Sequence, residues 1–84
     1  MKIYTYEVGG ILHRLTDEKE AVSRATEDTV KYCKEVLNWK VVPFTHKAVY
    51  DYENGKIIVP FYKRFKGGEM KKVYDITIRI KEEA

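Results

Sequence analysis

The stretch that decides the fold is DEKEAVSRATEDTVKYCKEVLN, residues 17–38. Its apolar and small side chains recur every three to four residues, the period of a helix that lays one face on a core. The members of this stripe are Val22, Ala25, Thr26, Thr29, Val30, Cys33, Val36 and Leu37. Asp17 and Glu20 have the spacing of a capping box, so a helix is predicted to begin there. We expect one amphipathic helix, about Asp17 to Asn38, packed on a sheet.

A β-hairpin is predicted before this helix. Residues 2–8 and 11–15 are rich in β-branched and aromatic side chains, and Gly9-Gly10 between them permits a tight turn.

Extended structure is also predicted after the helix. It resumes at residues 41–44 and alternates through 47–52, and Asn54-Gly55 indicates a hairpin turn into residues 56–62. Pro60 lacks a backbone donor, so its strand is expected at a sheet edge or at a bulge.

Residues 73–80 form the clearest strand pattern, with Tyr74, Ile76, Ile78 and Ile80 predicted to face the core and Asp75, Thr77 and Arg79 to face outward. We expect this strand to lie centrally. The predicted fold class is therefore α+β: a single domain over residues 1–84, in the order β-β-α-β-β-β, with the helix on one face of a mostly antiparallel sheet.

Composition favours a small folded protein of a reducing compartment. Of 84 residues, 44% are hydrophobic, which is too many for a disordered chain. No apolar run is long enough to cross a membrane or to act as a signal peptide, so a cytoplasmic location is expected. The one cysteine, Cys33, lies on the apolar stripe and is predicted to be a core residue. The absence of Gln and the abundance of Lys, Glu and Ile resemble the composition of thermophile proteins.

The positive charge is concentrated near the C-terminus. Residues 1–60 hold nine Lys or Arg and nine Asp or Glu, whereas residues 61–84 hold seven and four. Within the latter, FYKRFKGGEMKK, residues 61–72, combines five cations with three aromatic rings and one anion. Strand alternation would place Tyr62, Arg64 and Lys66 on one face of this ribbon and Phe61, Lys63 and Phe65 on the other.

Such a ribbon is typical of a sheet that binds nucleic acid or another polyanion, because cations meet phosphates and flat rings stack on unpaired bases. The residues predicted to bind are Tyr62, Lys63, Arg64, Lys66, Lys71 and Lys72. The alternative is that these cations protect an edge strand from unwanted pairing while Phe61 and Phe65 fill the core.

The sequence gives little indication of catalysis. The two imidazoles, His13 and His46, have no further ligand at metal-binding spacing, and no nucleophile, paired-carboxylate or phosphate-loop motif is recognisable. A Cys-His-Asp arrangement of Cys33, His13 and Asp75 would require a nucleophile on the buried face of a helix. We therefore expect a protein that is not an enzyme and that uses no metal or cofactor.

Trp39 directly follows the predicted helix, where an indole can cap the core, stack on a ligand or lie at a subunit interface. The order of Ile3-Tyr4-Thr5-Tyr6-Glu7-Val8, the amphipathic helix, Trp39-Lys40-Val41-Val42 and the closing strand at residues 74–80 resembles dodecins, which are small flavin-binding proteins. This resemblance covers about half the chain. It implies flavin stacking on Trp39 and assembly into a dodecamer.

Three functional hypotheses follow. The first is a non-enzymatic binding module that contacts nucleic acid or another polyanion through residues 61–72. The second is a protein-interaction or homo-oligomeric module that uses a strand edge and exposed tyrosines. The third is a dodecin-like module that binds a small flavin-type ligand. None of the three involves a membrane.

Overall fold

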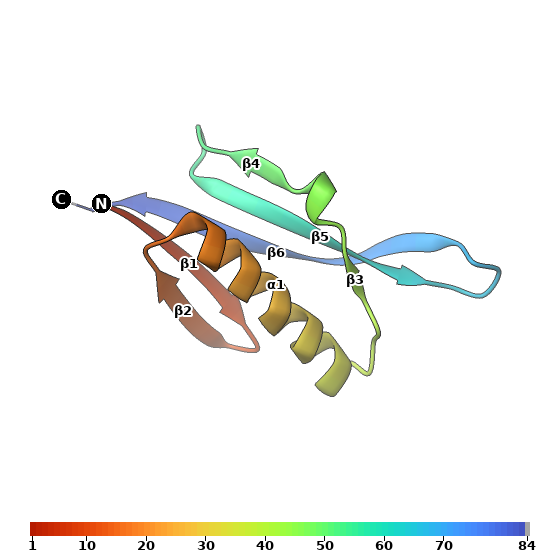
Figure 1. Ribbon diagram of the computed structural model, residues 1–84. Coiled ribbons are helices and arrows are strands. Elements are labelled where there is room, and N and C mark those ends of the chain that lie inside the picture. Colours follow the sequence, from red (N-terminus) through yellow and green to blue (C-terminus); the bar gives the residue numbers. More distant parts are fainter. Residues whose placement is uncertain (84) are drawn as a thin grey trace.

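The computed structural model describes residues 1–83 as one helix on a six-stranded antiparallel sheet (Figure 1). The elements are β1 (Lys2–Val8), β2 (Ile11–Leu15), α1 (Glu18–Glu35), β3 (Val42–Pro43), a 3-10 turn η1 (Thr45–Lys47), β4 (Val49–Asp51), β5 (Lys56–Arg64) and β6 (Met70–Glu82). The strand order is β2-β1-β6-β5-β3, and β4 pairs with β5 beside β3. The predicted fold class is confirmed, as is the central position of the last strand.

Helix α1 begins as predicted and ends earlier than predicted. The Asp17 side chain accepts a hydrogen bond from the Glu20 backbone N–H at 2.9 Å, which satisfies one of the free donors of the first turn. At the other end the helix stops at Glu35 rather than Asn38. Asn38 adopts a left-handed conformation with φ of 56°, and the Trp39 N–H donates to the Cys33 carbonyl, so the chain turns away there.

The buried face of α1 is narrower than the predicted stripe. Ala21, Ala25, Thr29 and Cys33, spaced four residues apart, are fully buried, whereas Val36 is 62% exposed. Ala21 was absent from the prediction and Val36 was wrongly included. The reason is that the sheet supplies the bulky side chains, so the closest approach goes to the smallest residues on the helix.

The core lies between α1 and one face of the sheet. It is built from alternate residues of the three central strands: Tyr4, Tyr6 and Val8 on β1, Ile76 and Ile78 on β6, and Ile57, Val59 and Phe61 on β5. Cys33 is part of this cluster, as predicted, and burial raises the pKa of its thiol. Figure 1 shows α1 crossing in front of β1 and β6, which places the core under the helix.

Strand β5 lies inside the sheet, so of the two alternatives predicted for the strand of Pro60, the edge position is excluded and a bulge next to the proline is found. On one side it pairs with β6, and on the other with β4 at residues 56–58 and with β3 at residues 61–62. Pro60 faces the junction of β3 and β4, where η1 interrupts the neighbouring strand. Proline has no N–H to donate there, and its carbonyl accepts a hydrogen bond from the Phe44 N–H. The ladder with β6 is irregular between Phe61 and Tyr62, directly after the proline.

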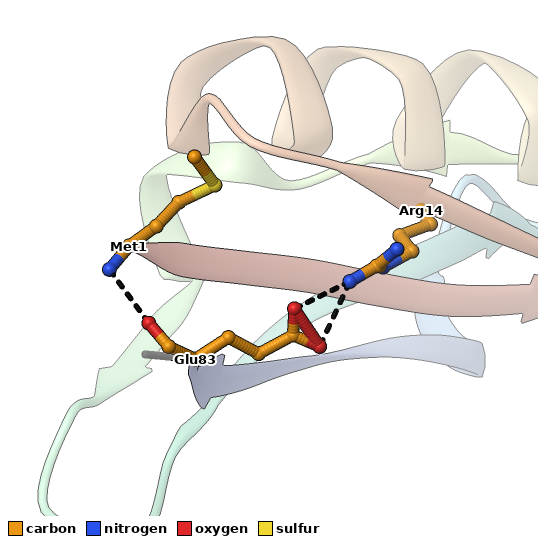
Figure 2. Close-up of polar contacts among 3 residues, drawn as sticks. All are labelled: Met1, Arg14 and Glu83. Carbon is orange, nitrogen blue, oxygen red and sulfur yellow. Dashed lines mark hydrogen bonds and ion pairs between the residues drawn. The ribbon is translucent and has the colours of Figure 1, made fainter.

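Strand β6 is longer than the predicted segment 73–80, and its two neighbours cover different parts of it. It pairs with β5 along residues 70–79 and with β1 only along residues 79–82. Close to this short pairing with β1, Arg14 donates two hydrogen bonds to the Glu83 carboxylate at 2.6 and 2.8 Å, and the Met1 ammonium donates to the Glu83 carbonyl (Figure 2). These contacts hold the two chain ends together.

The protein is elongated, with principal dimensions of 50 × 24 × 16 Å. The far ends of β5 and β6 and the turn between them extend past the rest of the sheet, at the opposite end from the termini (Figure 1). We call residues 62–72 the basic arm. Within residues 1–83, no helix is both long and apolar enough to cross a membrane.

Candidate nucleic-acid interface

The basic arm contains all six residues that the sequence indicated for polyanion binding. Tyr62, Lys63 and Arg64 end β5, Lys66 lies in the turn, and Lys71 and Lys72 begin β6. Lys63 lies opposite Lys71 in the ladder, and Tyr62 lies opposite Lys72. The fold therefore brings the six side chains onto one two-stranded ribbon.

The two phenylalanines of this region have different environments. Phe61 is completely buried and packs edge-on against Tyr74, whereas Phe65 is 39% exposed at the end of the arm. The alternative in which both rings fill the core therefore holds for Phe61 only. Phe65 is available as a flat apolar surface at a charged tip.

Two lysines surround the Phe65 ring. The Nζ of Lys63 lies 4.6 Å from the ring centroid, and the Nζ of Lys71 lies 5.6 Å from it. Both distances are within the range of cation–π attraction. We call Phe65, Lys63 and Lys71 the Phe65 cluster; it combines one aromatic face with two cations that can reach adjacent phosphates.

A second aromatic group occupies the other face of the ribbon. Phe44, which follows β3, stacks on Tyr62 with centroids 4.1 Å apart and planes 15° from parallel. The Nζ of Lys47 lies 5.5 Å from the centroid of Tyr62 and 5.8 Å from that of Phe44. These three residues, the Phe44 cluster, repeat the combination of ring and cation at the base of the arm.

The remaining cations of the arm differ in whether they contact an acceptor within the protein. Arg64 donates to the Gly68 carbonyl at 3.2 Å, which closes the turn, and Lys72 lies 3.4 Å from the Asp75 carboxylate. Lys66 is exposed in the turn. Such exposed pairs are weak, so these side chains can be redirected to a bound anion at little cost.

The charge on the molecule is divided between the arm and the remainder of the chain. Residues 62–72 carry five of the sixteen Lys and Arg but only one of the thirteen Asp and Glu, namely Glu69. The remaining residues carry eleven cations and twelve anions. A positive field therefore originates at the projecting end, where water and ions surround it on several sides.

Trp39 lies in the connection between α1 and β3. Its side chain is half-buried and packs against the core, and it borders a hollow of about 440 Å³ together with Val30, Lys34 and Lys40. This placement agrees with the core-capping role predicted for the indole.

A polar cluster that was not predicted lies on the helix side of the sheet. The Tyr6 hydroxyl donates to the Asp28 carboxylate at 2.6 Å, and His13 stacks on the Tyr6 ring with its Nε2 3.8 Å from the same carboxylate. The carboxylate beside His13 is thus Asp28 and not Asp75, which lies on the opposite face of the sheet. Among residues 1–83, no group of three or more His, Cys, Asp and Glu side chains is placed to hold a metal ion.

Comparison with known proteins adds nothing to these observations. No family model, no curated protein and no solved structure matches the chain.

Sequence reasoning missed Phe44 and Lys47, which complete the second aromatic group. They precede Tyr62 by more than ten residues, and no periodic pattern links them to it. Only the pairing of β3 with β5 brings them to the arm.

Proposed function

We propose that this protein binds single-stranded nucleic acid through the basic arm. The observation that carries the proposal is the Phe65 cluster: an exposed ring between two lysines at the end of a projecting, strongly cationic ribbon. Lysines neutralise phosphates and release counterions, and an aromatic face stacks on a base of any identity. The arrangement therefore favours binding without sequence preference.

Single strands suit the arm better than duplexes because its rings need unstacked bases as partners. The Phe44 cluster supports this assignment, since it provides a second ring and a third cation further along the ribbon. Because the two clusters lie on opposite faces of the ribbon, a strand that contacts both has to pass around an edge of the arm.

Fluorescence anisotropy with a labelled single-stranded oligonucleotide of about 20 bases, at low salt, tests the proposal. The variant Lys63→Ala, Lys66→Ala, Lys71→Ala should bind at least about 10-fold more weakly, because three phosphate contacts are lost. The matched control changes three exposed lysines of α1, Lys19, Lys31 and Lys34, to Ala. It lowers the net charge equally and should bind within about twofold of the native protein.

A second variant separates stacking from charge. Phe65→Ala should weaken binding by about 5- to 100-fold, the range for losing one base–aromatic stack. Leu12→Ala, which also removes an exposed apolar side chain but on β2, should have no effect. The proposal is wrong if the native protein leaves the anisotropy of the oligonucleotide unchanged, or if the arm and helix triple variants weaken binding equally.

A further inference from the structure

The face of the sheet opposite α1 carries a hollow of about 240 Å³ at the base of the basic arm, where η1 and β4 flank β5 (Figure 1). Its lining residues are Lys47 on η1, Val49 on β4, Ile58, Pro60 and Tyr62 on β5, and Lys72 and Asp75 on β6. Tyr62 and Lys47 also belong to the Phe44 cluster. A strand bound at that cluster therefore reaches the hollow.

The apolar part of the lining suits one flat ring. Pro60 is buried and Ile58 is half-buried, so they form an apolar floor, and Tyr62 adds an aromatic wall. The volume lies below the range of about 300 to 1,000 Å³ that is typical of pockets for drug-sized molecules. A single nucleobase is a ring system of suitable size and shape.

The hollow also contains an ion pair. The Nζ of Lys72 lies 3.4 Å from the Oδ2 of Asp75, and the ladder places both side chains on the face of Tyr62, because Lys72 pairs with Tyr62 and Asp75 with Pro60. An ammonium group only donates hydrogen bonds, and a carboxylate only accepts them. The pair therefore presents a donor directly beside two acceptor oxygens.

This pattern complements the Watson–Crick edge of guanine. On that edge the acceptor O6 lies next to two donors, N1–H and N2–H, so Lys72 can donate to O6 while the Asp75 carboxylate accepts from both N–H groups. Adenine and cytosine have one amino donor beside a ring-nitrogen acceptor, and thymine and uracil have one N–H between two carbonyls. Each of these bases directs an acceptor at one carboxylate oxygen, which costs binding energy.

We infer that this hollow receives one guanine base of the bound strand and reads it through the Lys72–Asp75 pair. The inference rests on the proposed function and adds to it a base preference at one position, since the rings and lysines of the arm contact bases and phosphates of any sequence. Lys47 lines the same hollow and can neutralise the phosphate of that nucleotide.

Fluorescence anisotropy with four labelled oligonucleotides tests the inference. Each is a run of about 12 thymines, and three of them carry guanine, adenine or cytosine at the central position. The oligonucleotide with guanine should bind at least about 5-fold more tightly than the other three, the lower limit for a good bidentate contact to a base.

Base analogues identify the edge that is read. Inosine at the central position lacks the N2 amino group and should lose most of the preference, because one carboxylate oxygen is left without its donor. 7-Deazaguanine is altered only on the opposite edge of the base and should bind as guanine does. Inosine bound as tightly as guanine would contradict the assigned contacts.

Asp75→Ala is the decisive variant. It removes both acceptor oxygens, so it should bind the four oligonucleotides within about twofold of one another. Its affinity for the all-thymine oligonucleotide should equal or exceed that of the native protein, because a negative charge is lost. The matched control is Glu7→Ala, which removes another exposed carboxylate but from β1, where Glu7 lines a different hollow. This control should keep the preference for guanine.

The outcomes separate this inference from the proposed function. Native protein that binds all four oligonucleotides equally, or a folded Asp75→Ala variant that still prefers guanine, would overturn the inference and leave the proposed function intact. Native protein that binds none of the four would overturn both. Circular dichroism establishes that each variant is folded.

Discussion

Burial of the Tyr6 side chain makes the stability of the protein depend on pH in the alkaline range. Its side chain is only 2% exposed, and its hydroxyl donates one short hydrogen bond to Asp28. Burial, and then the bond to the Asp28 carboxylate, raise the pKa of this hydroxyl well above its usual range. The folded protein therefore keeps a proton that the unfolded chain loses above about pH 10.

Stability should consequently fall as the pH rises above about 10, because only the unfolded state releases this proton. Each such group contributes a slope of about 1.4 kcal/mol per pH unit, and burial also raises the pKa of Tyr4 and Tyr74. Tyr6→Phe should lower the free energy of unfolding by about 1 to 2 kcal/mol at pH 8. The loss should shrink above about pH 10, because the variant lacks one titrating group.

Urea unfolding of both proteins between pH 8 and 11 measures this difference. Parallel stability curves for the native protein and Tyr6→Phe would contradict it.

Individual residues were predictable where one local pattern decides their role. The N-cap role of Asp17 and the burial of Cys33 both follow from spacing along one helix. The bond between Tyr6 and Asp28 joins residues 22 positions apart, so it depends on how α1 is rotated on the sheet. That rotation is set by the packing of small helical residues against large strand residues, which a periodic pattern does not contain.

Gly55 controls the hairpin turn between β4 and β5. It has a positive φ of 65°, which is costly for any residue with a Cβ, and a Cβ there would lie 3.0 Å from the Ile80 carbonyl oxygen. That oxygen belongs to β6, whose Ile80 N–H also donates to the Gly55 carbonyl. The turn is therefore packed directly against the central strand.

Gly55→Ala should lower the free energy of unfolding by about 2 kcal/mol, since it adds this close contact to the cost of a positive φ. Gly10→Ala is the matched control: its φ is 81°, but a Cβ there would meet nothing within 4 Å. It should cost about 1 kcal/mol. Thermal unfolding followed by circular dichroism compares the two, and equal losses would refute the packing argument.

The elements themselves were predicted unevenly. The N-terminal hairpin, the helix start and the alternation of the last strand have strong local signals and are confirmed. The end of α1 and the division of residues 41–52 into β3, η1 and β4 have none. Pro60 accounts for the break between β3 and β4, because its missing N–H faces these strands at that point. The sequence does not show which strands lie beside Pro60, so the break could not be predicted.

The concentration of positive charge on a projecting arm is a property of the whole molecule. The chain has a net charge of only +3, yet the arm projects from the remainder and has a net charge of +4, while the remainder has a net charge of −1. The excess of basic residues in 61–72 could be recognised from the sequence alone. Their presentation at one end of a 50 Å molecule depends on β5 and β6 continuing past their neighbours.

Salt dependence tests whether the arm as a unit carries the binding. If its five cations contact the phosphates of a single strand, the slope of log affinity against log salt concentration should be about −3.5, from about −0.7 per phosphate. The variant Lys63→Ala, Lys66→Ala, Lys71→Ala should reduce the magnitude of this slope by about 2. The helix variant Lys19→Ala, Lys31→Ala, Lys34→Ala should weaken binding slightly at every salt concentration and keep the native slope, because its cations face another part of the molecule. If the helix variant changed the slope as much as the arm variant, the protein would attract polyanions through its overall charge, and the arm would have no special role.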